Sequence, residues 1–203
     1  APDASVMKQL EALGYMGGSN DASNDLFSYT IDAKDRLETI AELTDIVKSR
    51  RDSPPASPAD IIARFEDLLD KEPQLGEARL ILGQTYAVMG RKEEAIQTFE
   101  EALSLNPESV VIALNLANQL ADLGRYQDGV AILEGVLERV PNDNSAQSNL
   151  LRMMSDNGDH IGAIEKGSRW LEQNPSFQIQ AILGVILVRN KQWVLAKEML
   201  QAS

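Results

Sequence analysis

The stretch GEARLILGQTYAVMGRKEEAIQTFEEALSLNP, residues 76–107, decides the fold of this chain. Its closing proline recurs at a constant interval, at Pro73, Pro107, Pro141 and Pro175. A fixed period of this size is typical of proteins built by stacking one supersecondary unit. We therefore predict a repeat architecture for most of the chain.

Each repeat is predicted to be a pair of helices. Leu82 and Tyr86 lie four residues apart in the first half of the stretch, which is the spacing of one helix face, and the second half repeats that spacing. Gly90 can adopt the left-handed conformation that ends a helix, and Pro107 cannot continue the second helix. Small residues, Gly83 above all, are expected where the two helices approach closely.

The same offsets carry related residues further along the chain. We place repeats at 76–107, 110–141, 144–175 and 177–203, the last displaced by one residue. This pattern closely resembles the tetratricopeptide repeat family. The resemblance implies an all-α, right-handed superhelical solenoid of antiparallel helical hairpins.

A degenerate repeat is predicted upstream, at 31–73. Phe65 stands one repeat period before Phe99, and helices are expected at 33–50 and 58–72 with a proline-rich loop insert between them. Residues 1–30 are predicted to form a short helix followed by a Gly/Ser/Asn/Asp-rich linker.

The third repeat departs from the family pattern. Leu151 stands where the family usually has glycine or alanine, Gly167 replaces a bulky residue, and Trp170 replaces a small one. We interpret the last two as an exchange of volume, in which the Trp170 indole fills the space that Gly167 leaves.

Composition excludes several classes of function. A net charge of −12 disfavours binding to nucleic acid or to an anionic membrane surface. The absence of cysteine excludes thiol chemistry, disulfides and cysteine metal sites. No apolar run approaches the ~20 residues that span a bilayer, so membrane insertion is not expected.

No catalytic, metal or cofactor site is predicted. His160 is the single histidine, and no partner for a nucleophilic triad or a metal site is evident. An aromatic ring packing at the turn between two helices is the favoured interpretation of His160.

A peptide-binding face is predicted on the first helix of each repeat, which in the family lines the concave surface. The candidate contact residues are Gln84, Asn115, Asn118, Asn149 and Arg152. Asn115 and Asn149 are separated by one repeat period and would stack as rungs. Their amides both donate and accept hydrogen bonds, so they could hold the backbone of an extended segment. The alternative is that they are ordinary residues of a hydrated surface.

The C-terminal segment 192–202 carries a second apolar stripe. Leu195 and Met199 lie on it, outside the stripe expected to pack against the solenoid. They are candidates for a dimer contact or for docking of another domain. Two tolerated surface residues would give the same pattern.

A second resemblance concerns the N-terminal region. The string MKQLEALGYMGG (7–18), followed by IDAKDRLETI (31–40), resembles the C-terminal end of bacterial sulfatases that carry tetratricopeptide repeats. The resemblance implies that the chain is the C-terminal region of a larger hydrolase, whose catalytic [CS]-x-P-x-R motif is not found here. The start at Ala1-Pro2-Asp3, without an initiator methionine, also suggests a piece of something longer, although tag removal or processing would leave the same end.

Two functions follow from the sequence. The first is non-catalytic binding of a protein or peptide. The alternative is an accessory region of a sulfatase-like hydrolase that positions substrate or assembles the enzyme, including by contact with its own catalytic domain. A periplasmic or exported location goes with the alternative, and a cytoplasmic one goes with a free-standing adaptor.

Overall fold

The computed structural model describes residues 33–49 and 57–191, with side chains from residue 37 onward. The chain divides into two compact units, Ala1–Glu38 and Thr39–Ser203. Of the first unit only residues 33–38 are described, so the account below concerns the second. The predictions for residues 1–30, for most of the proline-rich loop and for the segment 192–203 lie outside the described residues.

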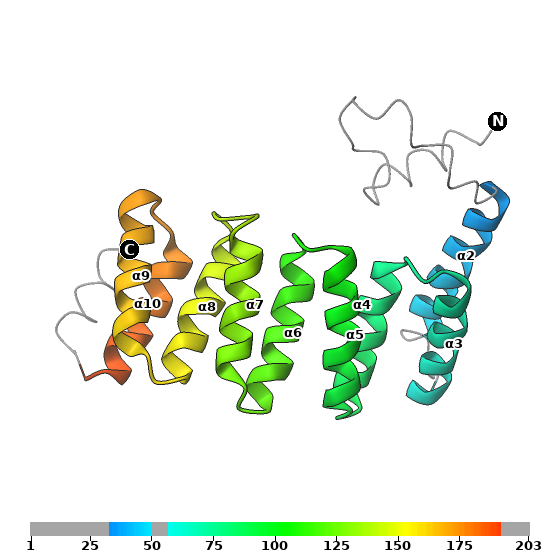
Figure 1. The fold of residues 1–203 in the computed structure, drawn as a ribbon, viewed down its shortest axis with the longest axis horizontal. Helices are drawn as coiled ribbons and strands as arrows, with labels where there is room; N and C mark the ends of the chain where they lie inside the picture. The colour runs from blue at the N-terminus through cyan, green and yellow to red at the C-terminus, as the bar shows by residue number, and fades with distance from the viewer. Residues whose placement is uncertain (1–32, 50–56, 192–203) are drawn as a thin grey trace. The chain divides into compact units, whose positions relative to one another are not determined.

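The described part of the chain is entirely helical (Figure 1). The helices are α2 (Ala33–Ser49), α3 (Pro58–Lys71), α4 (Gly76–Val88), α5 (Lys92–Leu105), α6 (Val110–Asp122), α7 (Tyr126–Leu137), α8 (Asn144–Asp156), α9 (His160–Gln173) and α10 (Phe177–Arg189). From α4 to α8, equivalent helices begin at the same interval as the recurring prolines, and α10 begins one residue early. The predicted all-α helical-repeat fold is confirmed. None of these described helices is long and apolar enough to cross a membrane.

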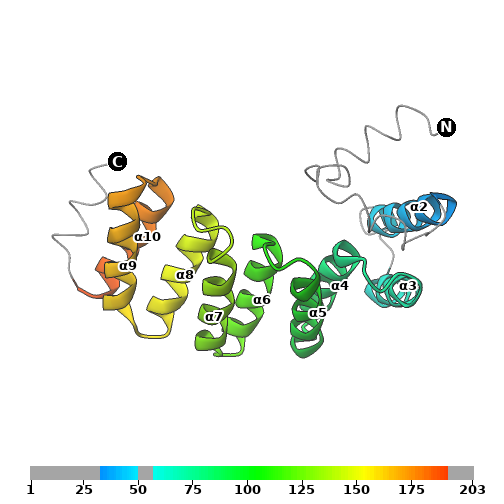
Figure 2. The ribbon, with the colours of Figure 1, turned by 45° about the horizontal axis from the view of Figure 1, so that its top comes forward.

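From α3 to α10, consecutive helices pack on one another. In addition, α4 contacts α6, α6 contacts α8, and α8 contacts α10. The first helices of successive repeats therefore form one row, with α5, α7 and α9 beside it (Figure 2). This arrangement brings residues one repeat period apart in the sequence onto neighbouring helices.

Left-handed residues end the first helix of each repeat. Gly90, Gly124 and Gly158 have φ values of 75°, 74° and 92°. An L side chain is strained in this region and glycine is not. At the equivalent position after α10, the chain has Lys191, with φ of 61°.

Polar side chains cap the start of the later first helices. Asp143 accepts a hydrogen bond from the Ala146 amide at 2.8 Å, and Ser109 and Ser176 cap α6 and α10 in the same way. These caps satisfy backbone donors that have no partner within the helix. They fix the residue at which α6, α8 and α10 begin.

The two helices of a repeat meet at one small residue and one large residue. A Cβ atom on Gly83 of α4 would lie 2.6 Å from Phe99 Cε1 of α5. Ala117 and Leu133 hold the equivalent positions in the next repeat and share a core cluster. Only a small side chain on one helix leaves room for the large one opposite.

The third repeat exchanges these sizes between the helices. Leu151 stands at the position of Gly83, and Gly167 stands at the position of Phe99. A Cβ on Gly167 would lie 2.8 Å from Leu151 Cδ1 and 2.7 Å from Leu183 Cδ2. The space left by Gly167 is therefore filled from α8 and α10.

This finding corrects the predicted exchange between Gly167 and Trp170. Trp170 is only partly buried, and it packs at the boundary between two core clusters with Lys166 Nζ 5.9 Å from its ring centroid. The exchange partner of Gly167 is Leu151. The sequence shows that Leu151, Gly167 and Trp170 all depart from the repeat pattern. Which of them compensate one another depends on which side chains are in contact.

The size exchange predicts energetic coupling between residues 151 and 167. Leu151→Ala should lower the free energy of unfolding by about 2–5 kcal/mol because it leaves a cavity. Gly167→Leu should cost about 1–3 kcal/mol because it overpacks Leu151 and Leu183. The double variant reproduces the Ala117/Leu133 pair. Its loss of unfolding free energy, measured by urea unfolding, should therefore be about 1–3 kcal/mol smaller than the sum of the losses of the two single variants.

Gly135→Leu provides the matched control. Nothing lies within 4 Å of a Cβ at Gly135, so this substitution combined with Leu151→Ala should be additive. Additivity of the 151/167 pair would contradict the reciprocal packing.

Lys191 offers a second test of the repeat geometry. Lys191→Gly should raise the stability by about 0.5–1 kcal/mol, because relief of left-handed strain exceeds the entropy that glycine adds to the unfolded chain. Gly158→Ala at the equivalent position should lower stability by about 1 kcal/mol. A thermal unfolding series that shows no gain for Lys191→Gly would mean that Lys191 is not strained.

Candidate functional site

The row of first helices presents one face, which we call the first-helix face. Its central position is occupied in successive repeats by Gln84, Asn118, Arg152 and Val185. Asn118 and Val185 are exposed, whereas Gln84 and Arg152 are half-buried. Four of the five predicted contact residues (Asn115, Asn118, Asn149 and Arg152) lie on α6 and α8, and Gln84 lies on α4.

Arg152 joins the predicted residues of two repeats. Its Nη2 donates to Asn118 Oδ1 at 2.9 Å and to Asn149 Oδ1 at 3.0 Å. Its Nη1 donates to Asp156 Oδ2 at 3.3 Å. One guanidinium therefore orients two asparagine amides across the junction of α6 and α8.

The Arg152 cluster continues to the next first helix. Asp156 also accepts a hydrogen bond from Arg189 Nη1 of α10, so two arginines share one carboxylate. The side chains of Arg152, Asp156 and Arg189 are 34%, 24% and 49% exposed. At such exposure ion pairs contribute little to stability, so the main consequence of the cluster is a fixed orientation. The pairing of Asp156 with Arg189 was not predicted from the sequence.

Asn115 and Asn149, the two asparagines one repeat period apart, each form a hydrogen bond within their own helix. Asn115 Nδ2 donates to the Val111 carbonyl at 2.8 Å, and Asn149 Nδ2 donates to the Ser145 carbonyl at 2.9 Å. Each amide nitrogen has two hydrogens, so one donor remains on each. Asn115 Oδ1 accepts no hydrogen bond from the described residues. The rungs are held in place while keeping groups that can bind a ligand.

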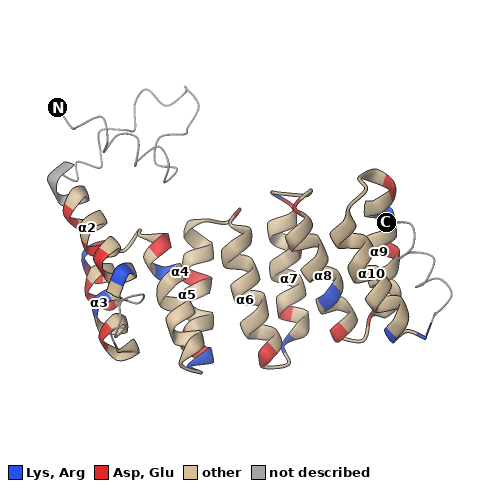
Figure 3. Cartoon of the chain, turned by 180° about the vertical axis from the view of Figure 1, so that it is seen from behind, with Lys and Arg blue, Asp and Glu red and all other residues tan. Residues whose placement is uncertain are grey.

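The first-helix face carries few charges. In α6 the single charged residue is Asp122, and in α10 it is Arg189. Figure 3 shows α6 almost entirely in the tan of uncharged residues, whereas α2 and α3 carry many charged residues in red and blue. A face of this composition is suited to hydrogen bonding with a peptide backbone rather than to binding by charge alone.

His160 has a structural contact. Its Nδ1 lies 2.8 Å from the hydroxyl oxygen of Ser155, a buried residue of α8. The contact links the end of α8 to the start of α9 across the turn. Among residues 33–49 and 57–191, no three acidic or histidine side chains gather in a way that could hold a metal ion.

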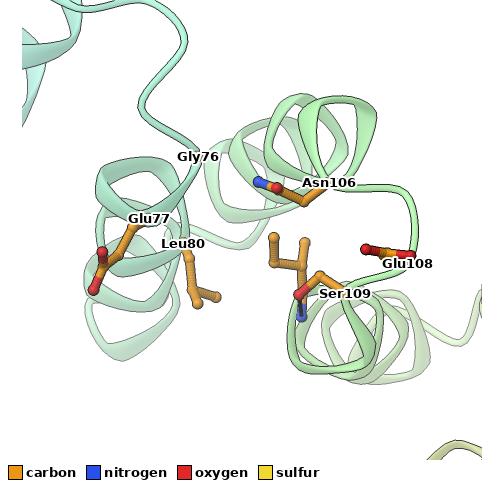
Figure 4. A pocket seen from close by; sticks show the side chains of 7 residues that line it. Gly76, Glu77, Leu80, Asn106, Glu108 and Ser109 are labelled. Atoms are coloured by element: carbon orange, nitrogen blue, oxygen red, sulfur yellow. Dashed lines mark hydrogen bonds between the residues drawn. The ribbon is translucent and has the colours of Figure 1, made fainter. Parts of the chain in front are cut away.

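A pocket that sequence reasoning missed lies between α4 and α6. Its volume is about 350 Å³, and Gly76, Glu77, Leu80, Asn106, Glu108, Ser109 and Ile112 line it. Figure 4 shows Leu80 on α4 facing the start of α6, Glu77 on the side of α4 away from α6, and Asn106 beside Gly76. The residues come from three elements, so no local sequence pattern could have indicated them. The other predicted contacts, Leu195 and Met199, lie outside the described residues.

Comparison with protein families agrees with this geometry. Residues 76–109 and 93–154 match two family models, both described as tetratricopeptide repeat. The matches to tetratricopeptide repeats thus extend over residues 76–154. A search of curated protein sequences found no match.

Solved structures show the same fold. MamA (41-end) from Desulfovibrio magneticus RS-1 superposes with a TM-score of 0.63 at 19% identity, over 81% of this chain and 92% of MamA. YrrB, described as a TPR protein with an unusual peptide-binding site, gives a TM-score of 0.58 at 21% identity, over 83% and 88% of the two chains. A tetratricopeptide repeat protein from Parabacteroides merdae ATCC 43184 gives 0.65 at 17% identity, over 80% and 64%. At these identities the likeness concerns the fold.

A buried tyrosine hydrogen bond joins α3 to α4, at the start of the row. The Tyr86 hydroxyl donates to Glu66 Oε1 at 2.6 Å, and the Arg91 guanidinium lies 4.5 Å from the ring centroid. Burial, and then the hydrogen bond to Glu66, raises the pKa of Tyr86 to about 12. The ordinary pKa of tyrosine is about 10.

This shift predicts a loss of stability at high pH. Folded Tyr86 keeps its proton where the unfolded chain has lost it, so the stabilisation is complete below about pH 10 and disappears between about pH 10 and 12. Urea unfolding should show an extra loss of about 2–3 kcal/mol over this range in wild type. Tyr86→Phe should lack that loss while being less stable at pH 8 by about 1 kcal/mol. Equal pH dependence of the two proteins would refute the assignment.

Proposed function

We propose that this region is a non-catalytic module that binds an extended segment of another protein on the first-helix face. The observation that carries the proposal is the oriented set of polar side chains on α6 and α8. Asn115 and Asn149 are one repeat period apart in the sequence, as are Asn118 and Arg152, and Arg152 donates to Asn118 and Asn149. An extended backbone has donors and acceptors at regular intervals, which such amides can satisfy.

The exposed groups around the rungs suit this kind of ligand. Val111 and Val185 are about half exposed, and Leu80 and Leu114 are half-buried. Apolar side chains of a bound segment could pack on these residues while its backbone meets the asparagines. YrrB, a protein of similar fold, is described as having a peptide-binding site, which is in keeping with the proposal.

The experiment is a screen of immobilised ten-residue peptides against wild type and the Asn115→Ala/Asn149→Ala variant. We expect peptides that bind wild type to bind the variant at least tenfold more weakly, because two hydrogen-bonding rungs are lost. Circular dichroism and urea unfolding would verify that the variant is folded.

The matched control is Asn157→Ala/Asn174→Ala. These asparagines are exposed at the C-termini of α8 and α9, away from the rungs, and their removal should leave peptide binding unchanged. Equal binding by wild type and the Asn115/Asn149 variant would overturn the proposal.

A second candidate function rests on the N-terminal sequence. The strings at 7–18 and 31–40 resemble the C-terminal end of bacterial sulfatases. We propose as the alternative that the region serves such a hydrolase, by positioning substrate or by contacting the catalytic domain, with Leu195 and Met199 as candidates for that contact or for a homodimer. The coding sequence upstream of Ala1 tests this. A [CS]-x-P-x-R motif there would support it, and an unrelated domain would exclude it.

A further inference from the structure

We infer that the pocket between α4 and α6 receives the side chain of a lysine or arginine, and that in the full interaction this residue belongs to the segment bound on the first-helix face. The second half of the inference rests on the proposed function. The first half concerns the pocket alone and can be tested separately.

The lining of the pocket matches the two parts of such a side chain. Leu80 and the buried Ile112 provide apolar surface for an alkyl stem. Asn106, Glu108 and Glu77 provide oxygen atoms for the cationic head. Lysine and arginine bind in this way because their stems favour apolar surface while their heads require acceptors.

The acidic side chains of the pocket are available. Neither Glu77 nor Glu108 forms an ion pair or a side-chain hydrogen bond with any residue in the described part of the chain. In Figure 4 the Glu108 side chain lies beside the space between the helices, and the Glu77 side chain extends from the side of α4 away from α6. Glu77 is exposed and has no described partner, so its side chain is free to turn toward a bound cation.

Comparison between repeats shows that this junction is unusual. At the next junction, between α6 and α8, the positions of Glu77 and Glu108 hold Val111 and Asn142. The positions of Gly76 and Asn106 hold Val110 and Val140, which are larger or apolar. At Gly76 a Cβ would lie 2.3 Å from Asn106 Nδ2, so glycine makes room for this amide. The junction between α6 and α8 therefore lacks the glycine, the asparagine amide and the two glutamates of the first junction.

The position of the pocket connects it to the proposed peptide site. Glu77 and Leu80 lie one repeat before Val111 and Leu114 of α6, so the pocket opens at the N-terminal end of the first-helix face. The net charge of −12 also favours encounter with a cationic partner. A basic residue of a bound segment would thus enter the pocket while the neighbouring backbone reaches Asn115.

The test uses N-acetyl-arginine amide as the probe and N-acetyl-citrulline amide, its neutral isostere, as the probe control. In two-dimensional ¹H–¹⁵N NMR titrations, the arginine probe should shift the amide signals of Gly76, Ser109 and Ile112 saturably. Citrulline should bind at least fivefold more weakly, because it lacks the charge that the carboxylates recognise. Equal shifts from the two probes, or shifts spread over the whole surface, would overturn the inference.

Three variants test whether the probe binds in the pocket or is attracted by the overall negative charge of the protein. Glu77→Gln/Glu108→Gln should weaken the arginine probe at least fivefold, whereas Glu100→Gln/Glu138→Gln, which removes two exposed charges from α5 and the end of α7, should not. Gly76→Val/Asn106→Val should abolish the localised shifts while keeping both carboxylates, because it places apolar side chains, as at Val110 and Val140 of the next junction, in the space that the probe would occupy. If the two glutamine pairs weaken binding equally, the pocket is not the site.

The peptide screen then tests the link to the proposed function. Wild-type binders should be enriched in lysine or arginine, and Glu77→Gln/Glu108→Gln should remove that preference without abolishing binding. Binding without any preference for basic residues would overturn this inference and leave the proposed function standing. If wild type binds no peptide in the screen but still binds the arginine probe, the proposed function is overturned and the inference about the pocket stands.

Discussion

The contact between one small and one large side chain inside each helical hairpin is the interaction on which the rest of the structure depends. Gly83 against Phe99, Ala117 beside Leu133, and Leu151 against Gly167 fill nearly the same space by different distributions of volume. Protein interiors are close-packed, so this pairing sets how near the two helices can lie. It thereby sets the spacing at which the next hairpin can stack.

Regular stacking has a direct consequence for binding. Because each first helix contacts the next, residues one repeat period apart lie side by side, and Arg152 can reach Asn118 while Arg189 reaches Asp156. A single helix could offer only a short line of polar groups. The row offers an extended one, which is the form of surface that an extended peptide requires.

Departures from the repeat are more informative about function than the repeat itself. The Leu151/Gly167 exchange preserves packing and changes nothing on the first-helix face. Gly76 and Asn106, which stand where the next junction has valines, instead line a surface pocket together with two glutamates. Lys191 adopts the left-handed conformation that glycine adopts in the other repeats. The repeat geometry therefore imposes a conformational free-energy cost at this residue.

The sequence by itself determined the helical hairpins, the turns at Gly90, Gly124 and Gly158, and the place of the candidate face, because helical spacing and the regular repeat period can be read along the chain. Only the tertiary structure decided which residue compensates Gly167, which partners Arg152 and Asp156 take, and where the pocket lies. Those features depend on distances between side chains of different helices and repeats. Such residues are far apart in the sequence, and packing alone brings them within a few ångströms of one another.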